Sequence, residues 1–137
     1  MNVNSDFEPP KKTEVHDLET TICWMHDGIF WAKTKKNTEH RVEHAKEQIE
    51  ILQLFATNNN VQMIPVICDV RNGSPLKKDV RDFYSSPIAA ENIKQFAFIV
   101  ESSVSKVIAN FFVNKRKLPI PVKMFTDVKL ALEWCKN

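Results

Sequence analysis

The stretch 63-MIPVICDV-70 decides the fold class of this chain. A nearly continuous apolar run of this length is typical of a strand that is buried on both faces of a sheet. Pro65 has no N–H to donate, which indicates an unpaired backbone position near the start of the strand. Strands of this kind belong mainly to α/β proteins, whose helices cover both faces of the sheet. We therefore expect helices on both sides of this strand in the sequence.

Upstream of this strand, the period of the apolar residues changes from two to about 3.6. From about residue 38 to residue 57, apolar side chains recur at steps of three and four, with charged residues elsewhere on the wheel, which predicts an amphipathic helix. Further upstream, residues 20–25 and 29–33 are β-prone runs on either side of Asp27-Gly28. Asp-Gly favours a tight hairpin turn because both residues tolerate positive φ. The domain is predicted to open with an antiparallel hairpin.

Downstream, capping residues alternate with apolar runs. Ser74 and Pro75 fit the N-cap and N1 positions of a second helix, because serine accepts an orphan N–H and proline lacks one. The remaining expected elements are a short turn of helix over 88–93 after Ser86-Pro87, a strand over 96–100, a helix capped by Ser102 or Ser103 with Val104, Val107, Ile108, Phe111 and Phe112 as its apolar face, a strand over 121–125, and a C-terminal helix capped by Thr126.

The predicted order is therefore β-β-α-β-α-β-α-β-α. Strands that alternate with helices predict right-handed crossovers and a mostly parallel sheet, which the opening hairpin makes mixed. We predict one α/β domain over residues 18–137, with a five-stranded sheet flanked by helices. Residues 1–17 are polar and contain Pro9-Pro10, so we expect a flexible arm that contributes little to the core.

Composition narrows the classes of function. The chain has 19 basic and 17 acidic residues and a net charge of +2, so no large field favours nucleic acid or anionic lipid. Lys115-Arg116-Lys117 with Lys123 could contact phosphates, but it also fits charge that complements a helix C-terminus. The sequence shows no signal peptide and no apolar stretch long enough to span a membrane. Together with three scattered cysteines, this predicts a cytoplasmic protein with reduced thiols.

Several motifs of this chain resemble the STAS-like superfamily, the fold of sulfate transporter domains and anti-sigma-factor antagonists. The similarity is greatest to stand-alone bacterial STAS-like proteins and covers about residue 19 to the C-terminus. The motifs are Asp27-Gly28-Ile29, Asp-Val-Arg-Asn at 69–72, Arg-Asp-Phe at 81–83, the helix of Val104 to Phe112, and the ending from Phe125 to Trp134. The resemblance implies a regulatory or protein-interaction module, with another protein or a second copy of the chain as partner.

The loop after the central strand is the candidate site. In phospho-regulated STAS antagonists, a serine at the start of the helix after a buried strand carries the phosphate, and Ser74 occupies the equivalent place. This chain has Asn-Gly-Ser-Pro-Leu at 72–76 where those proteins have Asp-Ser-Ser-Gly-Leu. Asp69, Arg71 and Asn72 could bind a polar group at this strand end. In the alternative interpretation, Ser74 only caps a helix, and the other residues form a turn and satisfy loop backbone.

Two further patterns allow other interpretations. His40 and His44 are four residues apart and could share a metal, but no third ligand stands at a recognised spacing, so we predict solvated helix residues and no metal or cofactor. The sequence contains no catalytic motif, which argues against an enzyme. Its aromatic residues could line a pocket for a small apolar or anionic ligand, a use suggested by the lipid-binding names of related folds, although most aromatic residues are core. They are Trp24, Phe30, Trp31, Phe83, Phe96, Phe98, Phe111 and Phe112.

Overall fold

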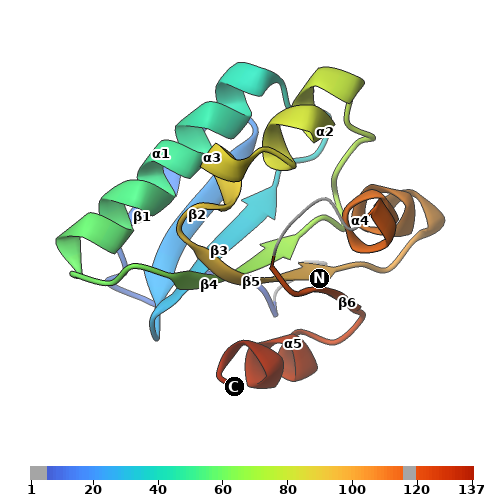
Figure 1. Ribbon diagram of the computed structural model, residues 1–137. Coiled ribbons are helices and arrows are strands. Elements are labelled where there is room, and N and C mark those ends of the chain that lie inside the picture. Colours follow the sequence, from blue (N-terminus) through green and yellow to red (C-terminus); the bar gives the residue numbers. More distant parts are fainter. Residues whose placement is uncertain (1–5, 116–119) are drawn as a thin grey trace.

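The computed structural model describes residues 6–115 and 120–137, with 111–115 as backbone only. Its strands form one sheet in the sequential order β1-β2-β3-β4-β5-β6 (Figure 1). They are β1 (Val15–Asp17), β2 (Thr21–His26), β3 (Ile29–Thr34), β4 (Ile64–Asp69), β5 (Ile93–Ile99) and β6 (Val122–Phe125). Strands β1 to β3 pair antiparallel, and β3 to β6 pair parallel. The mixed, mostly parallel sheet is confirmed, although the described chain has six strands instead of five.

The opening hairpin forms where the sequence predicts it. Strands β2 and β3 pair up to His26 opposite Ile29, with Asp27 and Gly28 as the two turn residues. Both have positive φ, 54° for Asp27 and 73° for Gly28. Two consecutive positive φ values define the type I′ turn, whose twist matches that of the flanking strands.

Helices cover both faces of the sheet. They are α1 (Val42–Asn58), α2 (Lys78–Tyr84), α3 (Pro87–Ala90), α4 (Ser103–Lys115) and α5 (Val128–Cys135). Helices α1, α2 and α3 lie over one face, α5 lies under the other, and α4 lies toward the β6 edge (Figure 1). None of the helices in the described ranges is long and apolar enough to cross a bilayer.

Helix starts agree with the predicted caps in two cases and differ in two. Ser86 accepts a hydrogen bond from the Ala89 N–H and starts α3, which ends at Ala90 because β5 begins at Ile93. The Ser102 hydroxyl accepts from the Ser105 N–H at the start of α4. Helix α5 is capped by Asp127, not by Thr126, since the Asp127 carboxylate accepts from the Lys129 N–H.

The prediction that Ser74 caps the second helix is wrong. Helix α2 begins at Lys78, with Lys77 at its N-cap, and Ser74 lies in an irregular, exposed segment. The reason is a tertiary contact that local sequence does not reveal. Leu76 is partly buried against the core under the helices, so the chain runs past Ser74 in a non-helical path before α2 can start.

The N-terminal residues contribute more to the structure than expected. Phe7 has 0% exposure, and its ring lies 5.7 Å from that of Trp24 and 5.2 Å from that of Trp31. Strand β1, at Val15–Asp17, adds to the hairpin edge of the sheet. The described part of the arm, residues 6–17, therefore packs on the domain and supplies core.

Helix α4 differs from its predicted apolar face. Ile108 is buried as expected, but Val104 and Val107 are 46% and 60% exposed. The helix packs mainly beside β6, so only one flank of its apolar stripe meets the sheet. The predictions for the side chains of Phe111, Phe112 and Lys115, and for Arg116 and Lys117, fall outside the described residues.

Candidate functional site

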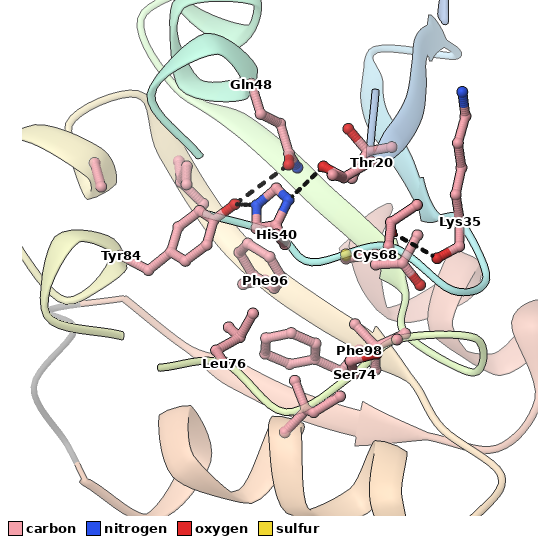
Figure 2. Close-up of a pocket in the computed structure, with 18 of the residues that line it drawn as sticks. Thr20, Lys35, His40, Gln48, Cys68, Ser74, Leu76, Tyr84, Phe96 and Phe98 are labelled. Atoms are coloured by element: carbon pink, nitrogen blue, oxygen red, sulfur yellow. Dashed lines mark hydrogen bonds between the residues drawn. The ribbon is translucent and has the colours of Figure 1, made fainter. Parts of the chain in front are cut away.

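A pocket lies between the sheet and the helices on the α1 side (Figure 2). The space in which a water-sized molecule can move is about 70 Å³, several times the roughly 10–15 Å³ that one buried water needs. The sheet side of its lining comes from Thr21, Thr34, Cys68, Val70, Ile93, Phe96 and Phe98, and the opposite side includes His40, Gln48, Leu76, Tyr84, Ala89 and Ile108. The pocket is therefore closed off by elements from most of the chain.

The hollow follows from the alternation of side chains along the strands. In a strand, successive side chains point to opposite faces. On the α5 face, Trp24, Trp31 and Ile67 fill the layer together with Phe7. On the face under α1, α2 and α3, several neighbouring strand positions carry small side chains. They are Thr21, Cys23, Ala32, Thr34 and Cys68. Large residues thus make the α5 face dense, while the small side chains of β2, β3 and β4 leave space on the other face, beside Phe96 and Phe98.

One end of the pocket carries a chain of hydrogen bonds. His40 Nδ1 lies 2.7 Å from the Thr20 hydroxyl, and His40 Nε2 lies 2.6 Å from the Tyr84 hydroxyl (Figure 2). Tyr84 in turn donates to Gln48 Oε1 at 3.3 Å. The rings of His40 and Tyr84 are almost parallel, with an interplanar angle of 2°. These contacts join the residues before β2, helix α1 and helix α2 around one polar corner.

Three titratable groups that line the pocket, His40, Cys68 and Tyr84, are neutral at pH 7. Burial, assisted by the electrostatic influence of the neighbouring His44 ring, lowers the pKa of His40 from 6.5 to about 4. Burial raises the pKa of the Cys68 thiol and that of the Tyr84 hydroxyl well above their usual values. Lys35 also contributes to the lining, but its ammonium points away from the pocket and pairs with Asp17 (Figure 2). The described lining thus offers hydrogen bonds without a net charge.

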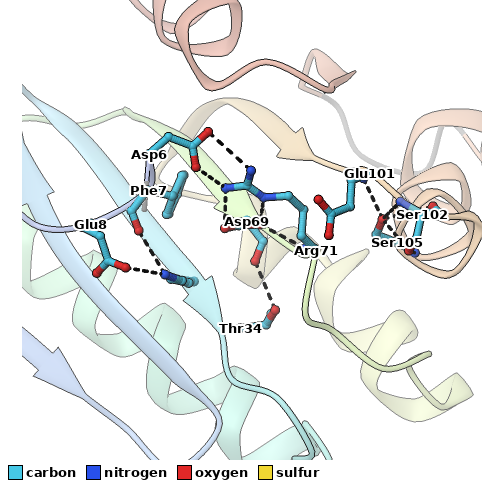
Figure 3. A network of polar contacts seen from close by, with 10 residues as sticks. Asp6, Phe7, Glu8, Thr34, Asp69, Arg71, Glu101, Ser102 and Ser105 are labelled. Atoms are coloured by element: carbon cyan, nitrogen blue, oxygen red, sulfur yellow. Dashed lines mark hydrogen bonds and ion pairs between the residues drawn. The ribbon is translucent and has the colours of Figure 1, made fainter. Parts of the chain in front are cut away.

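The candidate loop residues are divided between two faces of the sheet. Asp69 is 1% exposed and accepts from Arg71 through both carboxylate oxygens, at 2.9 Å each (Figure 3). Arg71 also donates to Asp6 at 3.0 Å, so the N-terminal segment completes this cluster. Ser74 lies instead at the pocket, as an exposed lining residue. Asn72 is half-buried.

The two histidines are placed differently from the prediction. His40 precedes α1 and is half-buried, and the His44 side chain within α1 is only 11% exposed, so the interpretation as solvated helix residues is wrong for both. Both ring nitrogens of His40 have partners, and the His44 ring lies 5.9 Å away. Across residues 6–115 and 120–137, no group of three or more histidine, cysteine or acidic side chains is placed to hold a metal ion.

Of the aromatic residues named from the sequence, Phe96 and Phe98 line the pocket, with ring centroids 4.6 Å apart. Trp24 and Trp31 stack on the opposite face of the sheet and are core. The polar corner of Thr20, His40 and Tyr84 was missed. Its members are separated by 20 and 44 residues in sequence, and no local motif connects them.

Comparisons with known proteins agree with this architecture. A family model described as a domain of unknown function, DUF7793, matches residues 23–137. The chain belongs to this family. The DUF7793 match begins at residue 23 and so leaves out Phe7, whose ring packs against Trp24 and Trp31. The comparison with curated proteins gives no match.

Among solved structures, this DUF7793 chain is similar to an uncharacterized protein of the DUF3478 family from Shewanella loihica PV-4, which has a SpoIIAA-like fold. The TM-score is 0.54 and the identity 16%, and the match covers 90% of this chain and 91% of that one. At this identity the likeness shows the fold alone. The predicted STAS-like architecture is confirmed.

Proposed function

We propose that this domain binds a small, uncharged and largely apolar ligand in the pocket under α1, α2 and α3, and acts as its sensor or carrier. The observation that carries the proposal is the combination of an apolar lining with a polar corner that holds no net charge. Binding pockets of this kind are mostly apolar, with a few polar groups that fix the orientation of the ligand.

The charge of the lining favours a neutral ligand over the anionic alternative. A buried carboxylate or phosphate needs a paired charge, because desolvation of an isolated ion is very costly. Lys35 is committed to Asp17, and His40 is neutral near pH 7. The described lining therefore lacks the cation that an anion would require.

Filling the pocket tests this proposal. Val70, the residue after β4, lines the pocket, whereas Val66 lies within β4, is buried on the same face of the sheet and does not line the pocket. The expected result is that Val70→Leu folds with wild-type stability and loses ligand, because the added methyl group enters empty space. Val66→Leu should lose about 1–3 kcal/mol, because it overpacks a filled core. Native mass spectrometry and urea denaturation of both variants measure the two effects.

The proposal fails if freshly purified wild-type protein carries no small molecule and gains no thermal stability from short-chain neutral compounds. It also fails if Val70→Leu is destabilised as strongly as Val66→Leu, because the pocket would then not be a usable space.

A second proposed function is the regulatory protein interaction that the STAS-like fold suggests, with another protein or a second copy of the chain as partner. The observation in its favour is Ser74, which is exposed and at the pocket, so that a kinase could reach it. A phosphate there would add between one and two negative charges beside a neutral pocket. Asp69 and Arg71 would hold the loop in place, and Asn72 would lie between them and Ser74.

Pull-down and light-scattering measurements on wild type, Ser74→Ala and Ser74→Asp distinguish this function. A partner or a dimer that Ser74→Asp loses and Ser74→Ala keeps would support a switch. Identical partners and masses for all three proteins would exclude control through Ser74.

A further inference from the structure

Four threonines line the pocket, and the hydroxyl groups of three of them already make hydrogen bonds within the protein. Thr34 donates to the Asp69 carbonyl at 3.1 Å, and Thr38 donates to the Lys35 carbonyl at 3.0 Å. Thr20 is bonded to His40. Thr21 differs, because its side-chain oxygen is buried and has no hydrogen-bond partner within the described structure.

The direction of the hydrogen bonds in the polar corner shows that Thr20 has no free hydroxyl proton to donate to a ligand. Tyr84 gives its hydroxyl proton to Gln48, so His40 Nε2 must donate to the Tyr84 oxygen. A neutral histidine that donates from Nε2 accepts at Nδ1. The Thr20 proton is therefore used on His40 Nδ1. These four side chains of the polar corner therefore satisfy one another's hydrogen-bonding groups.

Thr21 is then the one buried threonine of the lining that can both donate and accept. Thr21 is 2% exposed, so bulk water does not form a hydrogen bond with its hydroxyl group. An unpaired buried polar group costs free energy, and native structures rarely keep one without a reason. Thr21 lies directly opposite Thr34 in the β2–β3 pairing, on the floor of the pocket.

We infer that Thr21 is the residue that binds the polar end of the ligand, and that this end is a neutral hydroxyl or primary amide. The inference rests on the proposed function, and it names the anchoring side chain and the chemical class. A hydroxyl or amide can accept the Thr21 proton and donate to its oxygen, while its apolar chain lies against Phe96, Phe98 and Ile108. A carboxylate could only accept, and no cation of the described lining would pair with it.

The test compares end groups on one chain length in three proteins. The probes are 1-hexanol, hexanamide, hexanoate and hexyltrimethylammonium, titrated by calorimetry at pH 7.5 into wild type, Thr21→Val and Thr34→Val. Valine has nearly the shape of threonine, so each variant removes only a hydroxyl. Thr34→Val is the matched control, because its hydroxyl already bonds to the Asp69 carbonyl. Circular dichroism and urea denaturation establish that each variant is folded.

Wild type should bind 1-hexanol and hexanamide and discriminate against both ions. Thr21→Val should bind the two neutral probes about two- to tenfold more weakly, the range expected for one hydrogen bond. Thr34→Val removes a hydroxyl whose proton is already used on the Asp69 carbonyl, so it should weaken the binding of the neutral probes less than Thr21→Val does. If wild type binds the neutral probes and Thr21→Val binds them equally well, the anchor is wrong, and Thr21 holds at most a trapped water. If wild type binds hexanoate best, the ligand class is wrong. If wild type binds none of the probes, that result refutes both the proposed function and this inference.

Discussion

His40 gives the molecule a specific sensitivity to acid. Because burial, and to a smaller extent the neighbouring His44 ring, lower its pKa from 6.5 to about 4, the unfolded chain binds a proton in this pH range that the folded chain does not. Folding stability from the neutral ring is therefore complete above about pH 6.5 and is lost as the pH falls toward 4. The pKa difference of about 2.5 corresponds to at most about 3 kcal/mol, and to less where solvent reaches the half-buried ring.

The perturbation that tests this reasoning is His40→Gln. Glutamine can still hydrogen-bond to Thr20 and Tyr84, but it does not titrate. Urea denaturation at pH 7.5, 6.5, 5.5 and 4.5 gives the free energy of unfolding of both proteins. Wild type should lose about 1–2 kcal/mol more than His40→Gln across this range, a measurable share of the roughly 5–15 kcal/mol of a typical domain.

The groups that face His40 define the control. They are His44 in α1, which pairs with Glu19, together with Thr20, Gln48 and Tyr84. His26→Gln changes an exposed histidine at the hairpin and should keep the wild-type pH dependence. Parallel curves for wild type and His40→Gln between pH 7.5 and 4.5 would refute the claim that the buried ring is neutral.

Three further predictions concern the rest of the domain. Phe7→Ala should lower the free energy of unfolding by about 3–5 kcal/mol in urea denaturation, because it empties a site between two tryptophans; no change would mean that the N-terminal segment is undocked in solution. Arg71→Met should cost about 3–5 kcal/mol because it leaves Asp69 buried and unpaired, and adding Asp69→Asn should restore much of the lost melting temperature. Cys68 and Cys23 should resist a thiol reagent at pH 8 in the folded state and react in urea, because burial raises both thiol pKa values, that of Cys23 to about 12; rapid labelling of the native protein would contradict this.

Local chemistry explains which parts of the fold were predictable. The hairpin follows from two residues that tolerate positive φ, and the central strand follows from an uninterrupted apolar run. Strand β1 was missed because three residues, Val15–Asp17, carry no measurable alternation. Phe7 was missed for a different reason, since its partners Trp24 and Trp31 lie far along the chain and nothing next to it indicates that it is buried.

The residues of the loop after β4 were named from the sequence, but the side chains that contact them were not, and a binding role of this loop stays a prediction. The end of β4 is polar, because Asp69 at the end of an apolar strand needs a partner. That the partner is Arg71, helped by Asp6 from 65 residues away, depends on tertiary structure. The polar corner of the pocket depends on tertiary structure even more, because His40 meets Thr20 and Tyr84 only after the sheet and two helices have assembled.

The loop after β4 connects the buried ion pair with the pocket, and its anchoring indicates where the proposed ligand would enter. Arg71 fixes the start of the loop through Asp69 and Asp6. At Gly73, a Cβ atom would lie 3.2 Å from the Val70 carbonyl oxygen and 3.3 Å from Ile108 Cδ1, so this residue is held close to both β4 and α4. The chain is next secured at Leu76, leaving Ser74 and Pro75 exposed between two anchored points. Since the strands cannot separate without breaking the sheet, we expect a ligand to reach the pocket past Ser74 and Pro75.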